Sequence, residues 1–192
     1  LSSIILVVIH RIRTIDAHAA GEPLRLIIDG LPAPDGHTML EKRAWAQKRL
    51  DHLRKGLILE PRGHTDMYGA LLTEPVTRDA HAGVLFMHNE GWSTMCGHGI
   101  IAVTTMAVER GLIWPGDDNA GADKPTSVEI RYDTPAGLVH ARAHLSHYGD
   151  AVRVESVAFR NVPSFVFEPS LMVTIAGRKI PAEPVTMLEL VA

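Results

Sequence analysis

The strongest constraint on the fold is a helix-like run over residues 97–110, which carries apolar or small side chains over much of its circumference. A helix that is apolar on most sides lies buried inside a domain, because it has no broad face suited to water. Gly111 follows the run and predicts a glycine C-terminal cap. We therefore expect a central helix enclosed by other elements. Its apolar or small residues include Ile100, Ile101, Val103, Thr104, Ala107 and Val108.

Short strands are predicted on both sides of this run. Segments rich in isoleucine, leucine and valine, some with alternating polar residues, are typical of strands. A turn over residues 19–23 and a polar loop over residues 115–127 separate some of them. Short strands around two helices predict a lobe of the α+β class with a mostly antiparallel sheet. The predicted strands cover residues 4–15, 24–28, 56–60, 69–72, 83–88, 128–132, 137–145, 151–157 and 171–180.

A second helix is predicted from Thr38 to about Leu53. Thr38 and Glu41, three residues later, form a capping-box pattern, and Gly56 is expected to end the helix. Because its basic residues are interleaved with others, we interpret them as a solvated face and not as a nucleic-acid surface. One side of this helix carries Met39, Leu40, Ala44, Gln47 and Leu50, and its far end carries Lys48, Arg49, Arg54 and Lys55.

Charge and cysteine content limit the function classes. The 192 residues have a formal net charge of −3, which offers no electrostatic attraction to nucleic acid or to an anionic membrane. The apolar run over residues 4–9 is too short to span a bilayer. Cys96 is the only cysteine, which excludes an internal disulfide and is typical of a reducing compartment. We expect a cytoplasmic protein with no nucleic-acid or membrane partner.

The eleven histidines raise the question of a metal site. His140, His144 and His147 cluster in a segment that we interpret as a strand, on which His147 points away from the other two. The sequence has no His-Glu-x-x-His pattern and no second cysteine for a thiolate site. We therefore expect no metal.

Cys96 stands immediately before the predicted central helix. A helix N-terminus has free backbone N–H groups and a partial positive charge, and both favour the thiolate over the thiol. The position therefore suits a nucleophile or a base, with a pKa below that of a free cysteine. The N–H groups of Gly97, His98 and Gly99 could hold a carboxylate beside the sulfur. The alternative is that Cys96 is a small buried hydrophobic residue.

Three segments of the sequence resemble the proline racemase family. They are residues 16–23 (Asp-Ala-His-Ala-Ala-Gly-Glu-Pro), residues 62–70 (Arg-Gly-His-Thr-Asp-Met-Tyr-Gly-Ala) and residues 88–99, which end in Met-Cys-Gly-His-Gly. Their order matches, and the resemblance covers roughly residues 12–165. The family includes proline racemases, 4-hydroxyproline epimerases and trans-3-hydroxyproline dehydratases, none of which needs a cofactor.

The resemblance implies a fold and a site. The fold has two pseudosymmetric lobes of the diaminopimelate-epimerase type, each a strongly curved sheet around a central helix. The substrate is proline or a hydroxyproline, Cys96 abstracts its α-proton, and Gly97 and His98 contact it. The Gly-Glu-Pro segment lies near the active site in the family, although simple turn chemistry explains it equally well. His64 and Asp66 could likewise orient a ligand or only bond the local backbone.

The sequence departs from the family after residue 167. A further segment of the Asp-Ile-Ala-Tyr-Gly-Gly type and a whole second lobe are expected, but the segment is absent and the sequence runs only to Ala192. Because the chain also begins with Leu1, we expect a fragment. We assign residues 1–178 to the first lobe and residues 179–192 to a divergent tail or to the start of the second lobe, which is largely missing. Alone, we expect the chain to be inactive and to self-associate.

The second catalytic position of the family therefore lies outside the chain. The resemblance implies a cysteine there in racemases and typically a threonine in dehydratases. The flank over residues 89–94 (Asn-Glu-Gly-Trp-Ser-Thr) looks more like the dehydratase branch, so we favour a trans-3-hydroxy-L-proline dehydratase. A proline racemase or 4-hydroxyproline 2-epimerase remains an alternative, as does an inactive half that at most binds small carboxylates. A homodimer is the usual expectation for such an enzyme.

Overall fold

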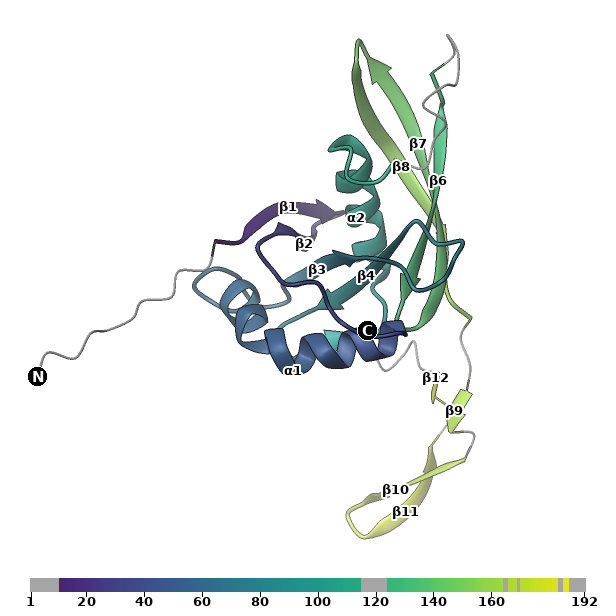
Figure 1. Ribbon diagram of the computed structural model, residues 1–192. Helices are drawn as coiled ribbons and strands as arrows, with labels where there is room; N and C mark the ends of the chain where they lie inside the picture. Colours follow the sequence, from purple (N-terminus) through teal and green to yellow (C-terminus); the bar gives the residue numbers. More distant parts are fainter. Residues whose placement is uncertain (1–10, 115–123, 164–165, 169, 183–184, 187–192) are drawn as a thin grey trace, which may run out of the picture. The chain divides into compact units, whose positions relative to one another are not determined.

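The computed structural model describes residues 11–114, 124–163, 166–168, 170–182 and 185–186 (Figure 1). The chain divides into two compact units, residues 1–161 and residues 162–192. The second unit pairs β9 (Val166–Glu168) with β12 (Val185–Thr186), and β10 (Leu171–Ile175) with β11 (Arg178–Ala182). The strand predicted over residues 171–180 is therefore a hairpin. The predicted boundary after residue 178 falls inside the second unit and stays a prediction.

The first unit is built on one mixed sheet. Its strand order is β1-β2-β3-β4-β6-β7-β8, with β5 paired to β4. The pairs β2–β3 and β4–β6 are parallel and all others are antiparallel, which confirms a mostly antiparallel sheet of the α+β class. Each parallel pair needs a crossover, and each crossover contains one helix. The strands are β1 (Arg13–Ala19), β2 (Glu22–Asp29), β3 (Tyr68–Thr73), β4 (Ala82–Met87), β5 (Trp92–Ser93), β6 (Ser127–Thr134), β7 (Gly137–Tyr148) and β8 (Ala151–Arg160).

Helix α2 (Gly97–Glu109) is the central helix that the apolar run predicted. It packs against strands from both ends of the sheet order, β1 to β3 on one side and β7 and β8 on the other, so the sheet curves around it (Figure 1). The predicted cap at Gly111 is confirmed. Gly111 has a φ of +63°, its N–H donates to Val108, and the N–H of Leu112 donates to Ala107 at 2.8 Å. These bonds satisfy carbonyl groups at the helix end.

Helix α1 (Met39–Ile58) begins as predicted and ends later. Thr38 Oγ1 accepts from the N–H of Glu41 at 3.1 Å, and Glu41 Oε2 accepts from the N–H of Thr38, which completes the capping box. The helix continues through Gly56, so the predicted strand over residues 56–60 is wrong. A glycine inside a helix costs about 1 kcal/mol relative to alanine. Fully burying Ile58, which is 0% exposed, contributes about 1.5–3 kcal/mol and outweighs that cost.

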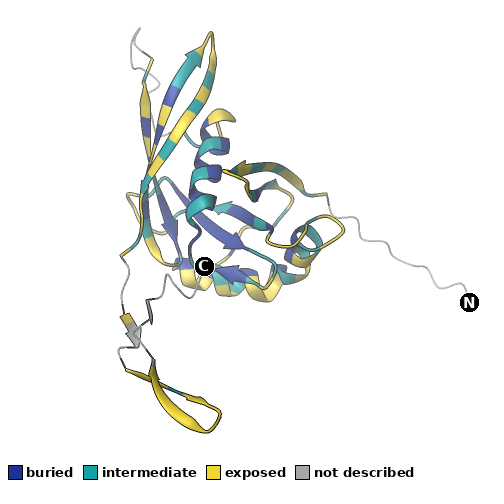
Figure 2. Cartoon of the chain, turned by 180° about the vertical axis from the view of Figure 1, so that it is seen from behind, coloured by how far each residue is buried: buried dark blue, intermediate teal, exposed yellow. Residues whose placement is uncertain are grey.

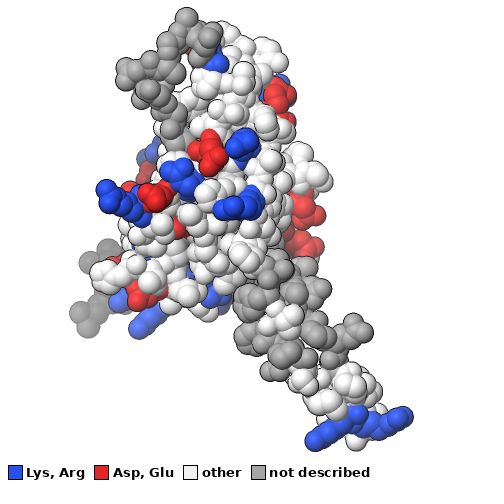
Figure 3. All heavy atoms as spheres, turned by 90° about the vertical axis from the view of Figure 1, so that its right-hand side faces the viewer, with Lys and Arg blue, Asp and Glu red and all other residues white. Residues whose placement is uncertain are grey.

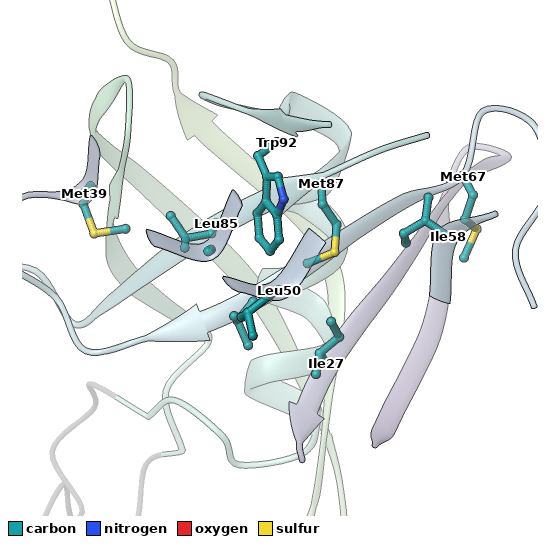
Figure 4. Packing of buried hydrophobic residues seen from close by; sticks show 10 residues of the cluster. Ile27, Met39, Leu50, Ile58, Met67, Leu85, Met87 and Trp92 are labelled. Atoms are coloured by element: carbon teal, nitrogen blue, oxygen red, sulfur yellow. The ribbon is translucent and has the colours of Figure 1, made fainter. Parts of the chain in front are cut away.

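The buried face of α1 also differs from the prediction. Leu40, Ala44 and Gln47 are exposed, whereas Lys42 and Arg54 are buried. Lys42 donates through Nζ to Thr73 Oγ1 at 3.2 Å and to the Glu74 carbonyl at 2.5 Å, so its charge is not buried without partners. The apolar part of this face joins the core shown in Figure 4, whose members are Ile27, Met39, Ala46, Leu50, Ile58, Met67, Leu71, Leu85, Met87 and Trp92.

Strand β4 is buried along its whole length, and β3 is buried over its centre (Figure 2). Leu85 and Met87 belong to the core beneath α1. Phe86, which alternates with them, lies on the opposite face next to Gly99 of α2. The two helices thus cover opposite faces of the sheet at β4. The chain that runs toward the start of α2 therefore leaves from a strand that is buried on both faces.

The surface carries both signs of charge. Figure 3 shows lysine and arginine interspersed with aspartate and glutamate on one face of the molecule. Some charged side chains pair across strands, as Glu129 does with Arg142 at 3.3 Å. Within the described part of the chain, neither helix is both long and apolar enough to cross a membrane.

Candidate active site

Cys96 is the N-cap residue of α2, where the sequence places it. Its backbone is extended (φ −147°, ψ 115°), and its carbonyl accepts from the N–H of Ile100 at 3.0 Å. The side chain is buried, with 6% of the residue exposed, and it makes no capping hydrogen bond to the helix. A Cβ on residue 99 would lie 2.9 Å from Cys96 Sγ and 2.6 Å from Phe86 Cε1. Glycine at this position therefore makes the space that the thiol occupies.

His98 lies directly beside the thiol. Its Nδ1 is 3.4 Å from Cys96 Sγ and its Nε2 is 3.6 Å away. The imidazole meets the ring of Tyr68 edge to face, with ring centroids 4.9 Å apart and an interplanar angle of 83°. Tyr68 in turn lies 5.4 Å from the ring of His88, centroid to centroid. Three rings from α2, β3 and the end of β4 therefore form one continuous wall next to Cys96.

The turn between β1 and β2 completes the site. The backbone of Pro23 lies close enough to the His98 ring to favour its charged form, which acts to raise the pKa of His98 against the larger, lowering effect of burial. The Glu22 carboxylate is close enough to raise the pKa values of Cys96, His98 and Tyr68. The Glu-Pro segment thus lies beside Cys96, at the end of a turn whose Gly21 has a φ of +102°. All three segments that carry the family resemblance meet at this place.

Burial reverses the expected state of the thiol. The pKa of Cys96 is raised to about 12, first because burial removes water from the charged form and further because Glu22 is negative. The Gly99 N–H lowers this pKa but does not offset burial. The prediction of a depressed pKa is therefore wrong for this structure. The start of the helix therefore lowers the pKa of the thiol, but the burial produced by tertiary packing has the larger effect.

The neighbouring histidines are shifted toward their neutral forms. Burial lowers the pKa of His98, and the charge of Glu22 and the nearby backbone of Pro23 oppose this shift. Burial also lowers the pKa of His88, which Arg54 and Arg43 lower further and Glu90 opposes. Neutral imidazoles can accept as well as donate a proton. The site thus places a protonated thiol beside a neutral imidazole at neutral pH.

The loop that precedes β3 leads into Tyr68, the first residue of that strand. His64 Nδ1 lies 2.6 Å from the Thr65 carbonyl, and the His64 carbonyl accepts from Asn89 Nδ2 at 2.9 Å. His64 thus bonds backbone, as one of its two alternatives proposed. Sequence reasoning missed Tyr68, although the residue lies within the quoted segment 62–70.

Phe159 is a second site residue that sequence reasoning missed. A Cβ on Gly97 would lie 3.3 Å from Phe159 Cζ, so the ring packs against the first turn of α2. In the sequence, the alternation of apolar residues along β8 predicts only that Phe159 faces one side of the sheet. It does not predict that the ring contacts α2. Gly97 and His98 occupy this first turn, where their N–H groups have no carbonyl one turn earlier within the helix. Their contact with a substrate stays a prediction.

The histidines of β7 do not form a metal centre. His140 Nδ1 lies 3.5 Å from Glu129 Oε1, and His147 Nε2 lies 2.8 Å from the Pro125 carbonyl. Across the part of the chain that the structure describes, no three His, Cys, Asp or Glu side chains are arranged to hold a metal ion.

Comparison with known proteins places these features in a family. The family model for proline racemase matches residues 14–179. A trans-L-3-hydroxyproline dehydratase from Xenopus tropicalis is 49% identical over 163 residues, which cover 85% of this chain and 44% of that protein. A trans-3-hydroxy-L-proline dehydratase from Bacillus thuringiensis is 50% identical over 162 residues, which cover 84% and 45%. Proline racemase A from Trypanosoma cruzi is 42% identical over 84% of this chain and 36% of that protein.

Solved structures agree with the sequence matches. A hydroxyproline epimerase from Agrobacterium vitis, with trans-4-hydroxy-L-proline bound, superposes with a TM-score of 0.72 at 27% identity and covers 88% of this chain and 47% of that one. A probable proline racemase from Agrobacterium radiobacter, with carbonate bound, also gives a TM-score of 0.72, at 30% identity, and covers 89% and 48%. The chain spans a little under half the length of these proteins. With its central helix and curved sheet, the chain belongs to the proline racemase family.

Proposed function

We propose that Cys96 is the acid–base residue of an enzyme that removes the α-proton of a proline-type amino acid, and that the reaction is dehydration of trans-3-hydroxy-L-proline. The observation that carries the proposal is the meeting of three sequence segments around a buried thiol at a helix N-terminus. The relatives from Xenopus tropicalis and Bacillus thuringiensis, both about half identical to the chain, are named as dehydratases of this amino acid. Their names support the choice of substrate.

The chemistry needs an anion-binding group as well as a base. When the thiolate takes the α-proton, an S–H bond forms and the electron pair of the broken Cα–H bond moves toward the substrate carboxylate. In this proposal, the N–H groups of Gly97 and His98 in the first turn of α2 bind that carboxylate. The electron pair then returns to form a Cα–Cβ double bond and expels the 3-hydroxyl group, which takes the proton of the Cys96 S–H group and leaves as water, so that the thiolate is regenerated. The resulting enamine tautomerises to a cyclic imine, so one water is lost overall.

Forming the thiolate is the demanding step in this structure. With a pKa of about 12, deprotonating Cys96 at pH 7 costs about 7 kcal/mol, since each pKa unit corresponds to about 1.4 kcal/mol. A proline-type substrate carries a secondary ammonium group, and a positive charge beside the sulfur favours the thiolate. The ammonium group also offsets the negative charge of Glu22. Substrate binding therefore lowers the cost of creating the base that the reaction uses.

Racemisation or epimerisation is the second candidate. It begins with the same proton abstraction by Cys96 but returns a proton to the opposite face of Cα, which needs a second acid there. The 42% identity to a proline racemase and the match to an epimerase with hydroxyproline bound favour this candidate. Binding of a small carboxylate without turnover uses only the N–H groups at the start of α2.

A graft tests the proposal directly. The 162-residue part of this chain that matches the Bacillus thuringiensis dehydratase replaces its counterpart in that enzyme. The purified protein then receives trans-3-hydroxy-L-proline, L-proline or trans-4-hydroxy-L-proline. We expect the first to be consumed with formation of a cyclic imine, and Cys96→Ser to abolish the reaction. NMR in D2O follows both the imine and α-proton exchange. Racemisation of proline without dehydration would disprove the choice of reaction, and full activity of Cys96→Ser would disprove the role of Cys96.

A further inference from the structure

Side chains of helix α1 bind the backbone of the loop that runs from β4 to α2 (residues 88–96). Arg54 is 3% exposed, and its Nη1 donates to the carbonyls of His88 and Asn89, each at 2.7 Å. Its Nε pairs with Asp51 Oδ1 at 2.6 Å, and this contact lowers the pKa of that carboxyl. Asp51 therefore stays charged and orients the guanidinium group toward the loop. A single buried cation satisfies two successive loop carbonyls.

Arg43, about three turns earlier on the same helix, holds the middle of the loop at Trp92. Its Nε donates to the Trp92 carbonyl at 2.7 Å, and its Nη2 donates to the same oxygen. The next contact belongs to the turn between β6 and β7, where the N–H of Ala136 donates to the Thr94 carbonyl at 3.2 Å. The loop that ends at Cys96 is thus fixed at its start, its middle and its end.

A continuous line of contacts connects Arg54 with the thiol. Arg54 binds the backbone of His88, the ring of His88 lies against Tyr68, Tyr68 meets His98, and His98 lies 3.4 Å from Cys96 Sγ. Aromatic contacts of this kind depend on ring orientation. A shift of the His88 backbone therefore changes the packing of Tyr68 and His98 and with it the access of water to the sulfur.

We propose that Arg54 and Arg43 are positioning residues for Cys96, because they hold the backbone of the loop that packs the His88–Tyr68–His98 wall against the thiol. The inference rests on the proposed function in taking Cys96 as the reactive group, but it concerns the reactivity of the thiol and not turnover. Arg54 supplies two short bonds to neutral carbonyls that a lysine, as a point charge, reproduces only in part. Arg43 binds one carbonyl oxygen, so a lysine can replace it more completely.

The test measures alkylation of Cys96 by iodoacetamide against pH in the 192-residue chain. Variants are Arg54→Met, Arg54→Lys, Arg43→Met and Arg43→Lys, with the exposed Arg49→Met of the same helix as the matched control. Alkylation follows the thiolate fraction, so each unit by which the pKa of the thiol falls makes the reaction about tenfold faster below the midpoint. We expect both Met variants to react at least about tenfold faster at pH 8, Lys variants to recover part or all of the protection, and Arg49→Met to match the wild type.

Folding is followed in parallel by circular dichroism and thermal melting. If both folded Met variants melt at lower temperature but alkylate with the wild-type rate and midpoint, the arginines are structural anchors only and the proposal is wrong. If Arg54→Met does not fold, the less buried Arg43→Met and Arg54→Lys decide the question by the same criterion. Altered alkylation together with an inactive graft would disprove the proposed function and leave the positioning role supported.

Discussion

Replacing Gly99 by alanine tests whether the space for the thiol is as restricted as the structure shows. Alanine inside a helix is normally favoured over glycine by about 1 kcal/mol. At residue 99, however, the new Cβ would lie 2.6 Å from Phe86 Cε1 and 2.9 Å from Cys96 Sγ, both closer than van der Waals contact. Phe86 is 0% exposed and lies in β4, so it cannot move away without disturbing the sheet.

The magnitude follows from the opposing contributions. Overpacking of a buried site costs about 1–3 kcal/mol, against the gain of about 1 kcal/mol from helix propensity. We therefore expect Gly99→Ala to lower the free energy of unfolding by up to about 2 kcal/mol. The cheapest relaxation moves the Cys96 sulfur away from residue 99, which exposes it to water. Alkylation of Cys96 by iodoacetamide should then become faster.

Gly56→Ala is the matched control. Gly56 also lies within a helix, but a Cβ there meets no atom within 4 Å. We expect this variant to raise the free energy of unfolding by about 0.5–1 kcal/mol and to leave alkylation unchanged. Urea unfolding of both variants shows directly whether each substitution raises or lowers the free energy of unfolding. Equal stabilisation by both substitutions, with the same alkylation rate, would refute the packing described around Cys96.

Three further predictions concern single residues. Cys96 should react slowly with iodoacetamide at pH 8, with a midpoint well above the ~8.5 of a free thiol and near the pKa of about 12 that burial produces; a midpoint at or below the free value would contradict this. His81 Nδ1 accepts from the N–H of Arg131 at 3.0 Å, and burial and Arg131 both lower the pKa of His81. The neutral His81 therefore contributes stability above pH 6.5, and this stability is lost as the pH falls through the lowered pKa of the folded state. His81→Asn should flatten the melting temperature between pH 7 and about pH 5, and an unchanged slope would count against His81. Asp133 is 3% exposed and accepts from the N–H groups of residues 76–77 at 2.8 and 2.6 Å. Asp133→Ala should therefore lower the free energy of unfolding in urea by about 3 kcal/mol. A loss below about 1 kcal/mol would mean that water replaces the carboxylate.

Local signals in the sequence correctly predicted the start of α1 and the end of α2. The capping box of Thr38 and Glu41 and the glycine after α2 lie within a few residues of the groups that they satisfy. The end of α1 was missed because it depends on Ile58 packing beside Gly69 of β3, a contact between segments joined only by the fold. The buried face of α1 was missed for a related reason. Lys42 and Arg54 are tolerated inside because β3, the Glu74 carbonyl and the loop after β4 supply acceptors.

The sequence by itself determined the family, the central helix and the position of Cys96 at its start. Each of these follows from a short continuous pattern in the sequence. Three motifs in order indicate the family, apolar residues around the helix indicate its central place, and the Cys-Gly-His-Gly segment indicates where that helix starts. Only the tertiary structure decided the state of the thiol. The burial of Cys96 at the start of α2, the charge of Glu22, and the wall formed by Tyr68 and His88 all depend on segments far apart in the chain. Desolvation and charge depend on distance in space, so a pattern read along the chain predicts the place of the sulfur but not its pKa.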